Sequence, residues 1–268
     1  MTFSRRTKRG YGWVADLPDI RDYAFAPRRA TRVPRHVDLR VSAAMPNVWN
    51  QGNYGSCTAH AVGAALAFAH NKANIAANGE AFERMLSGFM PSRFFIYRGE
   101  RVIDGDVAQD NGAQIRDGMK VISKQGAPDE KLYPYDAKHF NLAPSKSVLA
   151  NAAKHKATKY QRIDNRTCTG TLAALATGSP VAFGFTVYTS FESDAVAASG
   201  VVPMPLPDEQ VLGGHAVLAV GYDARAKYLI VRNSWGSAWG DKGYFTMPFD
   251  YAFNPSLADD FWTVAVAT

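Results

Sequence analysis

The sequence predicts an α+β fold, with a helical N-terminal lobe at about 50–135 and a β-rich C-terminal lobe at about 136–268. Three observations lead to this prediction. A long apolar run of good helix formers begins at Cys57, the second half holds short segments rich in β-branched and aromatic residues, and Gly, Pro, Asp and Asn separate those segments. Helices that precede a run of strands in this way are typical of α+β proteins.

The strongest helical pattern follows a Gly-Ser pair. Ala, Val and Leu form a broad apolar face along CTAHAVGAALAFAHNKA, and Gly55 and Ser56 directly before it suit a helix N-terminus. A helix this apolar is expected to be buried. Further helices are predicted at about 92–102, 112–125 and 171–177, where glycines close the last two patterns.

Five segments of the second half have the composition of antiparallel strands. They are PVAFGFTVY, HAVLAVGYD, YLIVRNSW, GYFTMP and FWTVAVA, with turn-forming residues between them. The N-terminal residues differ from both halves, because they are rich in Arg, Pro and Asp and lack helical or strand periodicity. We therefore expect an N-terminal arm or short pro-like segment at 1–35, followed by one globular domain at 36–268.

Composition places the chain among globular proteins, since 47% of its 268 residues are hydrophobic and 20% are charged. The net charge of +6, from 30 Lys and Arg against 24 Asp and Glu, owes much to the arm. No basic stripe interleaved with aromatic residues follows the arm, so we expect no nucleic-acid partner. The chain is expected to be a monomer.

Only two cysteines are present, Cys57 and Cys168, so we expect neither a disulfide framework nor a thiolate metal site. No nucleotide or flavin motif is visible, and we expect no cofactor. The N-terminus lacks the apolar run of about 7–15 residues that a signal peptide needs, and no later stretch approaches about 18 apolar residues. We expect no membrane span, and a protein that is cytoplasmic or exported by a signal-independent route.

Cys57 is the strongest candidate nucleophile. A thiol reacts as its anion, and a helix N-terminus and a neighbouring imidazolium both stabilise that anion. Cys57 opens the strongest helix, whereas Cys168 in RTCTGT is interpreted as a structural thiol. Gln51 lies six residues before Cys57 in QGNYGSC, near enough for its amide and the Cys57 backbone N–H to hold an oxyanion.

His215 is the preferred base among six histidines. It begins a predicted strand in LGGHAVLAVGYD, where Gly213 and Gly214 give close access to the backbone, so its ring can face the sulfur across a cleft. His60 is three residues past Cys57 on the same helix and points elsewhere. Asn233, in VRNSWGSAWGDKGYF, is suited to orienting His215, and Trp235 to shielding that contact from water.

Three blocks, QGNYGSC, GGHAVLAVGYD and RNSWGSAWGDKGYF, in this order resemble the signature blocks of papain-like (C1 family) cysteine peptidases. VPRHVDLR resembles the mature start of that family, and YPY at 133–135 recurs in it. The resemblance runs from about Val33 to the C-terminus and is closest to the small bacterial branch.

The resemblance implies a papain-like two-lobed fold, with helices on one side, an antiparallel β-barrel-like sheet on the other and the active-site cleft between them. It implies a cysteine-type peptidase in which Cys57 forms a thioacyl-enzyme with peptide or protein substrates, paired with His215 as general acid/base. Asn233 and Gln51 complete the expected catalytic set. Substrate-binding residues are expected at Asn111, Gly112, Gly213, Gly214 and Trp235.

This chain departs from the family pattern at several positions. Asn53 and Tyr54 stand where members usually have a disulfide cysteine, and Thr58 stands where an aromatic residue commonly follows the nucleophile. The arm is shorter than a typical propeptide. Its apolar residues suit a segment that lies along the cleft, so we expect it to inhibit the enzyme and the chain to be a zymogen; these residues are Trp13, Leu17, Pro18 and Tyr23. A disordered tail is the alternative for this segment.

Two other functions stay open at this stage. A papain-like amidase or acyltransferase would use the same nucleophile and base, and a catalytically silent binding domain would keep the cleft. Turnover of peptides distinguishes the silent domain, and the mass of the products distinguishes the acyltransferase.

Overall fold

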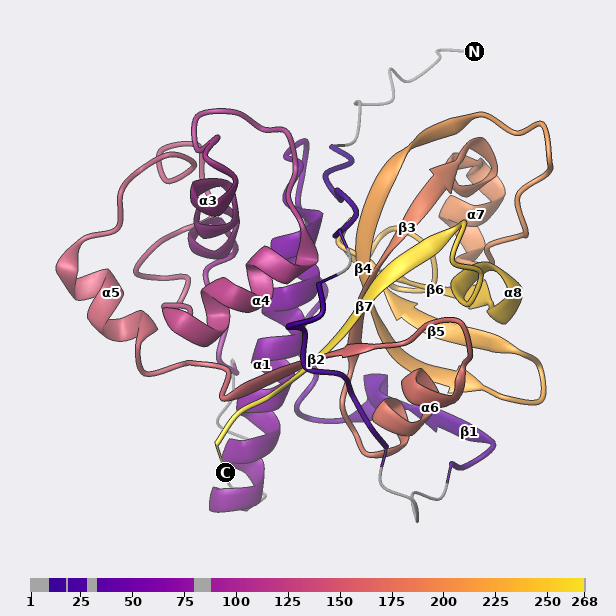
Figure 1. The fold of residues 1–268 in the computed structure, drawn as a ribbon, viewed down its shortest axis with the longest axis horizontal. Helices are drawn as coiled ribbons and strands as arrows, with labels where there is room; N and C mark the ends of the chain where they lie inside the picture. The colour runs from indigo at the N-terminus through magenta and orange to yellow at the C-terminus, as the bar shows by residue number, and fades with distance from the viewer. Residues whose placement is uncertain (1–9, 18, 28–32, 80–87, 268) are drawn as a thin grey trace.

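The computed structural model describes residues 10–17, 19–27, 33–79 and 88–267. Helices gather on one side of the molecule and a twisted sheet on the other, so the α+β prediction is confirmed (Figure 1). The helical side consists of α1 (Cys57–Asn78), α3 (Arg93–Asp104), α4 (Ile115–Lys124) and α5 (Lys146–Ala152).

The sheet has seven antiparallel strands. Six follow the order β2-β7-β3-β4-β5-β6, and β1 pairs with β4. The path does not close on itself, so the expected barrel-like sheet is an open one. The strands are β1 (His36–Asp38), β2 (Lys159–Ile163), β3 (Val181–Tyr188), β4 (Val211–Asp223), β5 (Tyr228–Arg232), β6 (Tyr244–Pro248) and β7 (Ala258–Ala265).

Helix α1 lies where the two sides meet and packs against β4. Its N-terminal half, from Cys57 to Phe68, is buried, as the apolar sequence predicts. One hydrophobic cluster joins α1, α3 and α4 to one face of the sheet, with Leu218 and Trp262 among its members. A second cluster covers the opposite face, where Phe183 stacks on Phe261. The sheet is therefore buried on both faces.

The predicted helices at 92–102, 112–125 and 171–177 correspond to α3, α4 and α6 (Thr169–Ala176). Helix α4 begins later than expected because Gly112 has a φ of 82° and Gln114 is extended. The sequence analysis did not predict β1, β2 or α5. It also missed four shorter elements, which are the 3-10 helices Leu39–Val41 and Thr189–Glu192 and the helices α7 (Asp194–Ser199) and α8 (Phe249–Ala252).

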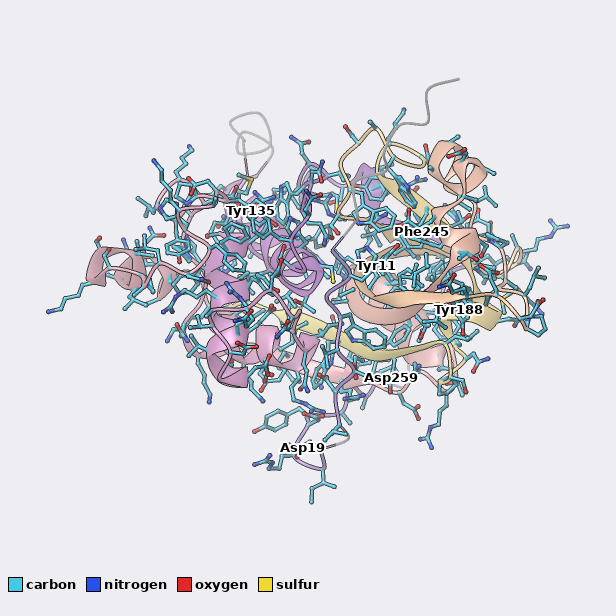
Figure 2. All side chains as sticks on the ribbon, turned by 90° about the horizontal axis from the view of Figure 1, so that it is seen from above. Tyr11, Asp19, Tyr135, Tyr188, Phe245 and Asp259 are labelled. Atoms are coloured by element: carbon cyan, nitrogen blue, oxygen red, sulfur yellow. The ribbon has the colours of Figure 1, made fainter. Side chains whose placement is uncertain are left out.

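The described part of the arm runs between the helices and the sheet (Figure 1). Trp13 forms a parallel bridge with Ala113, and Ala24 forms one with Arg162 on β2. Figure 2, viewed from above, shows Tyr11 near the centre of the molecule and Asp19 at its edge. Pro18 and the basic residues at positions 1–9 and 28–32 lie outside the described residues. Among the described residues, no helix combines the length and apolar character that crossing a bilayer requires.

Candidate active site

Cys57 is the first residue of α1 and is completely buried. It forms no disulfide. The loop before it is fixed by Tyr135, whose hydroxyl lies 2.6 Å from Ser56 Oγ and donates to the Gln51 carbonyl at 2.9 Å. The sulfur therefore lies at the positive end of a long helix, as the sequence predicts.

The surroundings of the sulfur in the structure oppose its ionisation. Burial raises the pKa of the Cys57 thiol to about 11, although hydrogen bonds with the backbone of Ala216, Gly12 and Thr58 lower it. Gly12 belongs to the N-terminal segment expected to form an arm, so the backbone of this segment contacts the thiol. The environment of the sulfur in the structure favours the neutral thiol.

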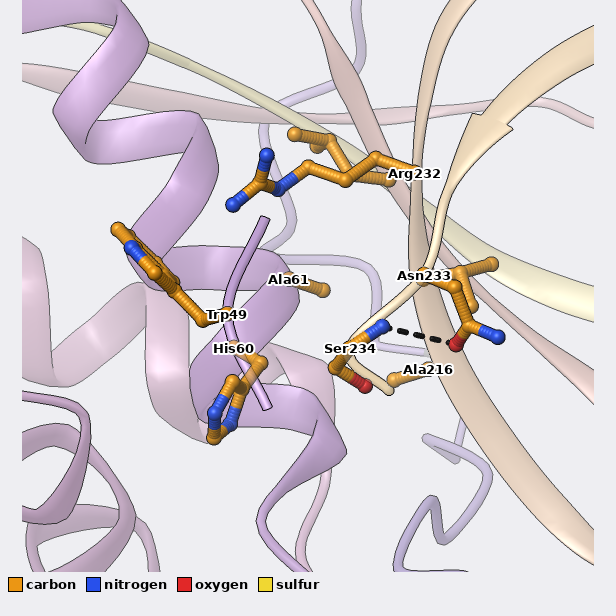
Figure 3. Close-up of a pocket in the computed structure, with 9 residues that line it drawn as sticks. Trp49, His60, Ala61, Ala216, Arg232, Asn233 and Ser234 are labelled. Atoms are coloured by element: carbon orange, nitrogen blue, oxygen red, sulfur yellow. Dashed lines mark hydrogen bonds between the residues drawn. The ribbon is translucent and has the colours of Figure 1, made fainter. Parts of the chain in front are cut away.

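His215 and Asn233 lie side by side, on β4 and directly after β5. His215 Nε2 is 2.9 Å from Asn233 Oδ1. The same oxygen accepts the Ser234 backbone N–H at 2.8 Å (Figure 3). A backbone N–H can only donate, so it identifies the amide oxygen, and His215 Nε2 must then carry the hydrogen. Nδ1 is the nitrogen left to exchange a proton.

Trp235 stacks on the imidazole of His215, with ring centroids 4.9 Å apart and planes inclined by 26°. The indole is 8% exposed and His215 is fully buried. This is the shielding position expected for Trp235. The hydrogen bond between His215 and Asn233 is therefore kept away from water, which strengthens it.

The side-chain amide of Gln51 points at the arm. Its Nε2 donates to the Gly10 carbonyl at 2.8 Å and to the Tyr54 carbonyl at 2.7 Å, while its Oε1 accepts from Ser234 Oγ at 2.5 Å. A peptide carbonyl thus lies against the donor that the sequence assigned to an oxyanion. Ser234, which the sequence did not single out, holds this amide in place.

The expected substrate-binding glycines contact the arm. A Cβ on Gly112 would lie 2.2 Å from the Gly12 carbonyl oxygen, and one on Gly213 would lie 2.9 Å from Tyr11 Cβ. Gly214 accepts the Trp13 backbone N–H at 3.0 Å. Asn111 instead donates to Asp106 and is exposed, and the residue that pairs with the arm is Ala113, which sequence reasoning missed.

His60, on α1, has a structural partner. His60 is buried with its Nδ1 2.9 Å from the Ser56 carbonyl oxygen, and it lines a small pocket behind Asn233 together with Trp49 and Arg232 (Figure 3). Within the described residues, no group of three or more His, Cys, Asp or Glu side chains is placed to hold a metal ion.

Comparisons with known proteins agree with this geometry. A family model described as "Papain family cysteine protease" matches residues 100–258. A peptidase C1-like protein of Acanthamoeba polyphaga mimivirus is 39% identical over 276 residues, which cover 100% of this chain and 83% of that protein. A cathepsin B-like protein of Giardia intestinalis is 31% identical over 240 residues, or 84% of this chain and 73% of its own.

The fold has solved counterparts as well. Xylellain, a cysteine protease from Xylella fastidiosa, superimposes with a TM-score of 0.84 at 37% identity, and the match covers 100% of both chains. The sequence blocks, the fold and these relatives lead to the same assignment. This chain belongs to the papain family of cysteine proteases and is a cysteine peptidase.

Proposed function

We propose that the protein hydrolyses peptide bonds through a thioacyl-enzyme on Cys57. His215 Nδ1 takes the thiol proton, and the thiolate attacks the carbonyl carbon of the scissile peptide bond. The π electrons of that carbonyl group move to its oxygen. That oxygen is held by the Gln51 amide and the Cys57 backbone N–H. Collapse breaks the C–N bond, and His215 returns the proton to the leaving amine. Water then gives a proton to His215 and attacks the thioester carbon, the C–S bond breaks, the acyl group leaves as a carboxylic acid, and His215 returns the proton to the sulfur of Cys57.

The observation that carries this proposal is the extended peptide already lying across the site. The arm brings the Gly10 carbonyl to Gln51 and Gly12 to the sulfur of Cys57. Ala113 donates to the Gly12 carbonyl at 2.7 Å and accepts from the Val14 backbone N–H at 3.0 Å. Main-chain groups of the enzyme therefore bind an extended backbone here, which supports a peptide as the substrate.

We propose further that residues 1–35 form an inhibitory arm and 36–268 the peptidase domain. The arm contacts the nucleophile, the oxyanion donor and Gly214, so substrate and arm compete for the same groups. Strand β1 begins at His36 and joins the sheet through β4, which supports the boundary. On this proposal the chain is a zymogen whose activity depends on displacement of the arm.

Alkylation by iodoacetamide together with turnover of fluorogenic peptides tests the mechanism. Cys57→Ala should abolish both turnover and the fast phase of labelling, whereas the matched variant Cys168→Ala should keep both. Trp13→Ala should speed up labelling, because it loosens the arm over the thiol. Retention of turnover by Cys57→Ala would refute the nucleophile assignment, and product masses showing transfer to amines rather than water would favour the acyltransferase alternative.

A further inference from the structure

The indole of Trp13 occupies a pocket on the sheet that depends on two missing side chains. A Cβ on Gly184, in β3, would lie 2.0 Å from Trp13 Cε2, and one on Gly214, in β4, would lie 2.8 Å from Trp13 Cε3. Real Cβ contacts are never so short, so the ring fits only because both residues are glycine. We call the space bounded by Gly184, Gly214 and Asp260 the indole pocket.

The polar end of the indole pocket is Asp260, on β7. Its Oδ2 accepts the Trp13 Nε1–H at 3.0 Å and the Asp16 backbone N–H at 2.7 Å, while Oδ1 accepts from Arg162 at 2.7 Å. Asp260 is 0% exposed and has a φ of 59°, a conformation that is rare outside glycine and is concentrated at functional positions. The backbone of β7 thus holds one carboxylate oxygen toward the indole.

The pocket belongs to the enzyme and not to the arm. Gly184, Gly214 and Asp260 lie on three neighbouring strands, and Gly214 directly precedes His215. When the arm leaves, Asp260 Oδ2 loses both of these donors, whereas Oδ1 keeps Arg162. Water can take the place of the two donors, so a side chain that displaces this water must bring a donor of its own, since a buried oxygen without one is unfavourable.

We propose that the indole pocket selects peptides carrying a flat aromatic ring with an N–H group, tryptophan being the natural residue that fits. This inference rests on the proposed peptidase function. Ala113 offers both its N–H and its C=O, so a bound peptide can pair with it and direct one side chain into the pocket, as the arm does with Trp13. The two glycines limit the size of the aromatic ring that the pocket accepts. Asp260 requires that this ring carry an N–H group.

The test compares two peptides of the same shape in the full chain. Tryptophan and 3-benzothienylalanine, in which sulfur replaces the N–H, are placed in turn at each of the three residues before the scissile bond. The docked arm excludes both peptides equally, so the ratio of their kcat/KM values reports only the pocket. At one position we expect a preference for tryptophan of about tenfold, the size of one hydrogen bond to a charged acceptor.

Asp260→Asn should bring that ratio close to one. Arg162 can only donate, so the amide oxygen would turn to it and leave the NH₂ facing the ring. Asn also tolerates the positive φ. Asp259→Asn is the matched control, because Asp259 contacts the same Arg162 at 3.2 Å, and it should keep the preference. Equal ratios at all three positions in the wild type would overturn the inference.

A binding measurement separates this inference from the peptidase proposal. Trp13→Gly opens the pocket in the full chain, and calorimetry should then show indole binding about tenfold more tightly than benzothiophene, with the difference lost on Asp260→Asn. Equal affinities would overturn the pocket's N–H requirement. The expected difference in affinity, in a chain that cleaves no peptide, would support the pocket and refute the proposed hydrolysis.

Discussion

Replacing Asp16 of the arm by Asn is expected to remove a pH dependence from inhibition. The Asp16 carboxylate is buried, accepts the Trp262 Nε1–H at 3.1 Å and lies 3.5 Å from Arg162 and 4.0 Å from Arg116. Burial raises the pKa of Asp16 from 3.8 to about 7, the nearby Asp260 adds to the rise, and the two arginines lower it. The docked arm therefore holds a proton that the released arm gives up.

The direction of the pH dependence of arm docking follows from this difference in pKa. A carboxyl whose pKa is higher in the docked arm favours docking fully below its ordinary pKa, and that advantage disappears as the pH rises through about 7. Each unit of pKa is worth about 1.4 kcal/mol, so docking weakens by up to about 4 kcal/mol between pH 4 and pH 7 and then levels off. Burial likewise raises the pKa of Asp260, which acts in the same direction, and the same arginines also face Asp22 and Asp259.

The assay is kcat/KM of the full chain from pH 4 to pH 9, divided at each pH by that of Asp16→Asn. Asn keeps the shape of a protonated carboxyl but does not titrate, so the variant holds its arm docked at high pH. The ratio should start near one and rise by up to about tenfold per pH unit toward pH 7. Asp19→Asn is the control, because Asp19 is on the same arm and pairs with Arg21 at the surface. A flat ratio, or one that rises toward acid, would refute the reasoning.

Three further substitutions test separate parts of the molecule. Gln51→Ala should lower kcat by about 10²–10³-fold, and Asn233→Ala by about 10²-fold, in chains that still fold; loss of folding instead would mean that these residues serve stability. Trp13→Ala should raise the activity of the full chain, because it weakens docking of the arm by up to about 3 kcal/mol. Val14→Ala should leave activity unchanged, because the Val14 side chain is 46% exposed. Equal effects of the two substitutions would count against the indole pocket. Glu100→Gln should raise the melting temperature at pH 9 but not at pH 5. Burial raises the pKa of Glu100 to about 8, so the wild type loses stability as the pH rises through that value, whereas Gln does not titrate. Unchanged melting temperatures at both pH values would contradict this.

Much of the site could be predicted because its signals are local in the sequence. Cys57 follows a Gly-Ser pair and opens an apolar helix, and Asn233 and Trp235 lie in one glycine-rich block. The structure brings His215, Asn233 and Trp235 together as expected. The sequence could not show whether Asn111 or Ala113, on either side of Gly112, pairs with a peptide. The choice depends on the backbone conformation of Gly112, whose φ is positive.

The contacts that hold the arm had no local signal. Trp13 and Asp260 are 247 residues apart, and LADDFW contains nothing that distinguishes a buried carboxylate from an exposed one. Strand β2 lies at an edge of the sheet and is only partly buried. Its sequence KYQRI is therefore polar and lacks the apolar pattern by which a strand is predicted. A lowered pKa of Cys57 was expected from the helix N-terminus and a neighbouring imidazolium, but in the structure burial raises this pKa.

The place of β7 has a consequence for biosynthesis. It follows the other six strands in the sequence yet lies inside the sheet, between β2 and β3, and it carries Asp260. A chain still emerging from the ribosome has the nucleophile and the imidazole long before it has this strand. On the proposed inhibition by residues 1–35, the strand that anchors Trp13 is thus synthesised after the nucleophile and the imidazole, so a nascent chain gains this inhibitory contact only once β7 is complete.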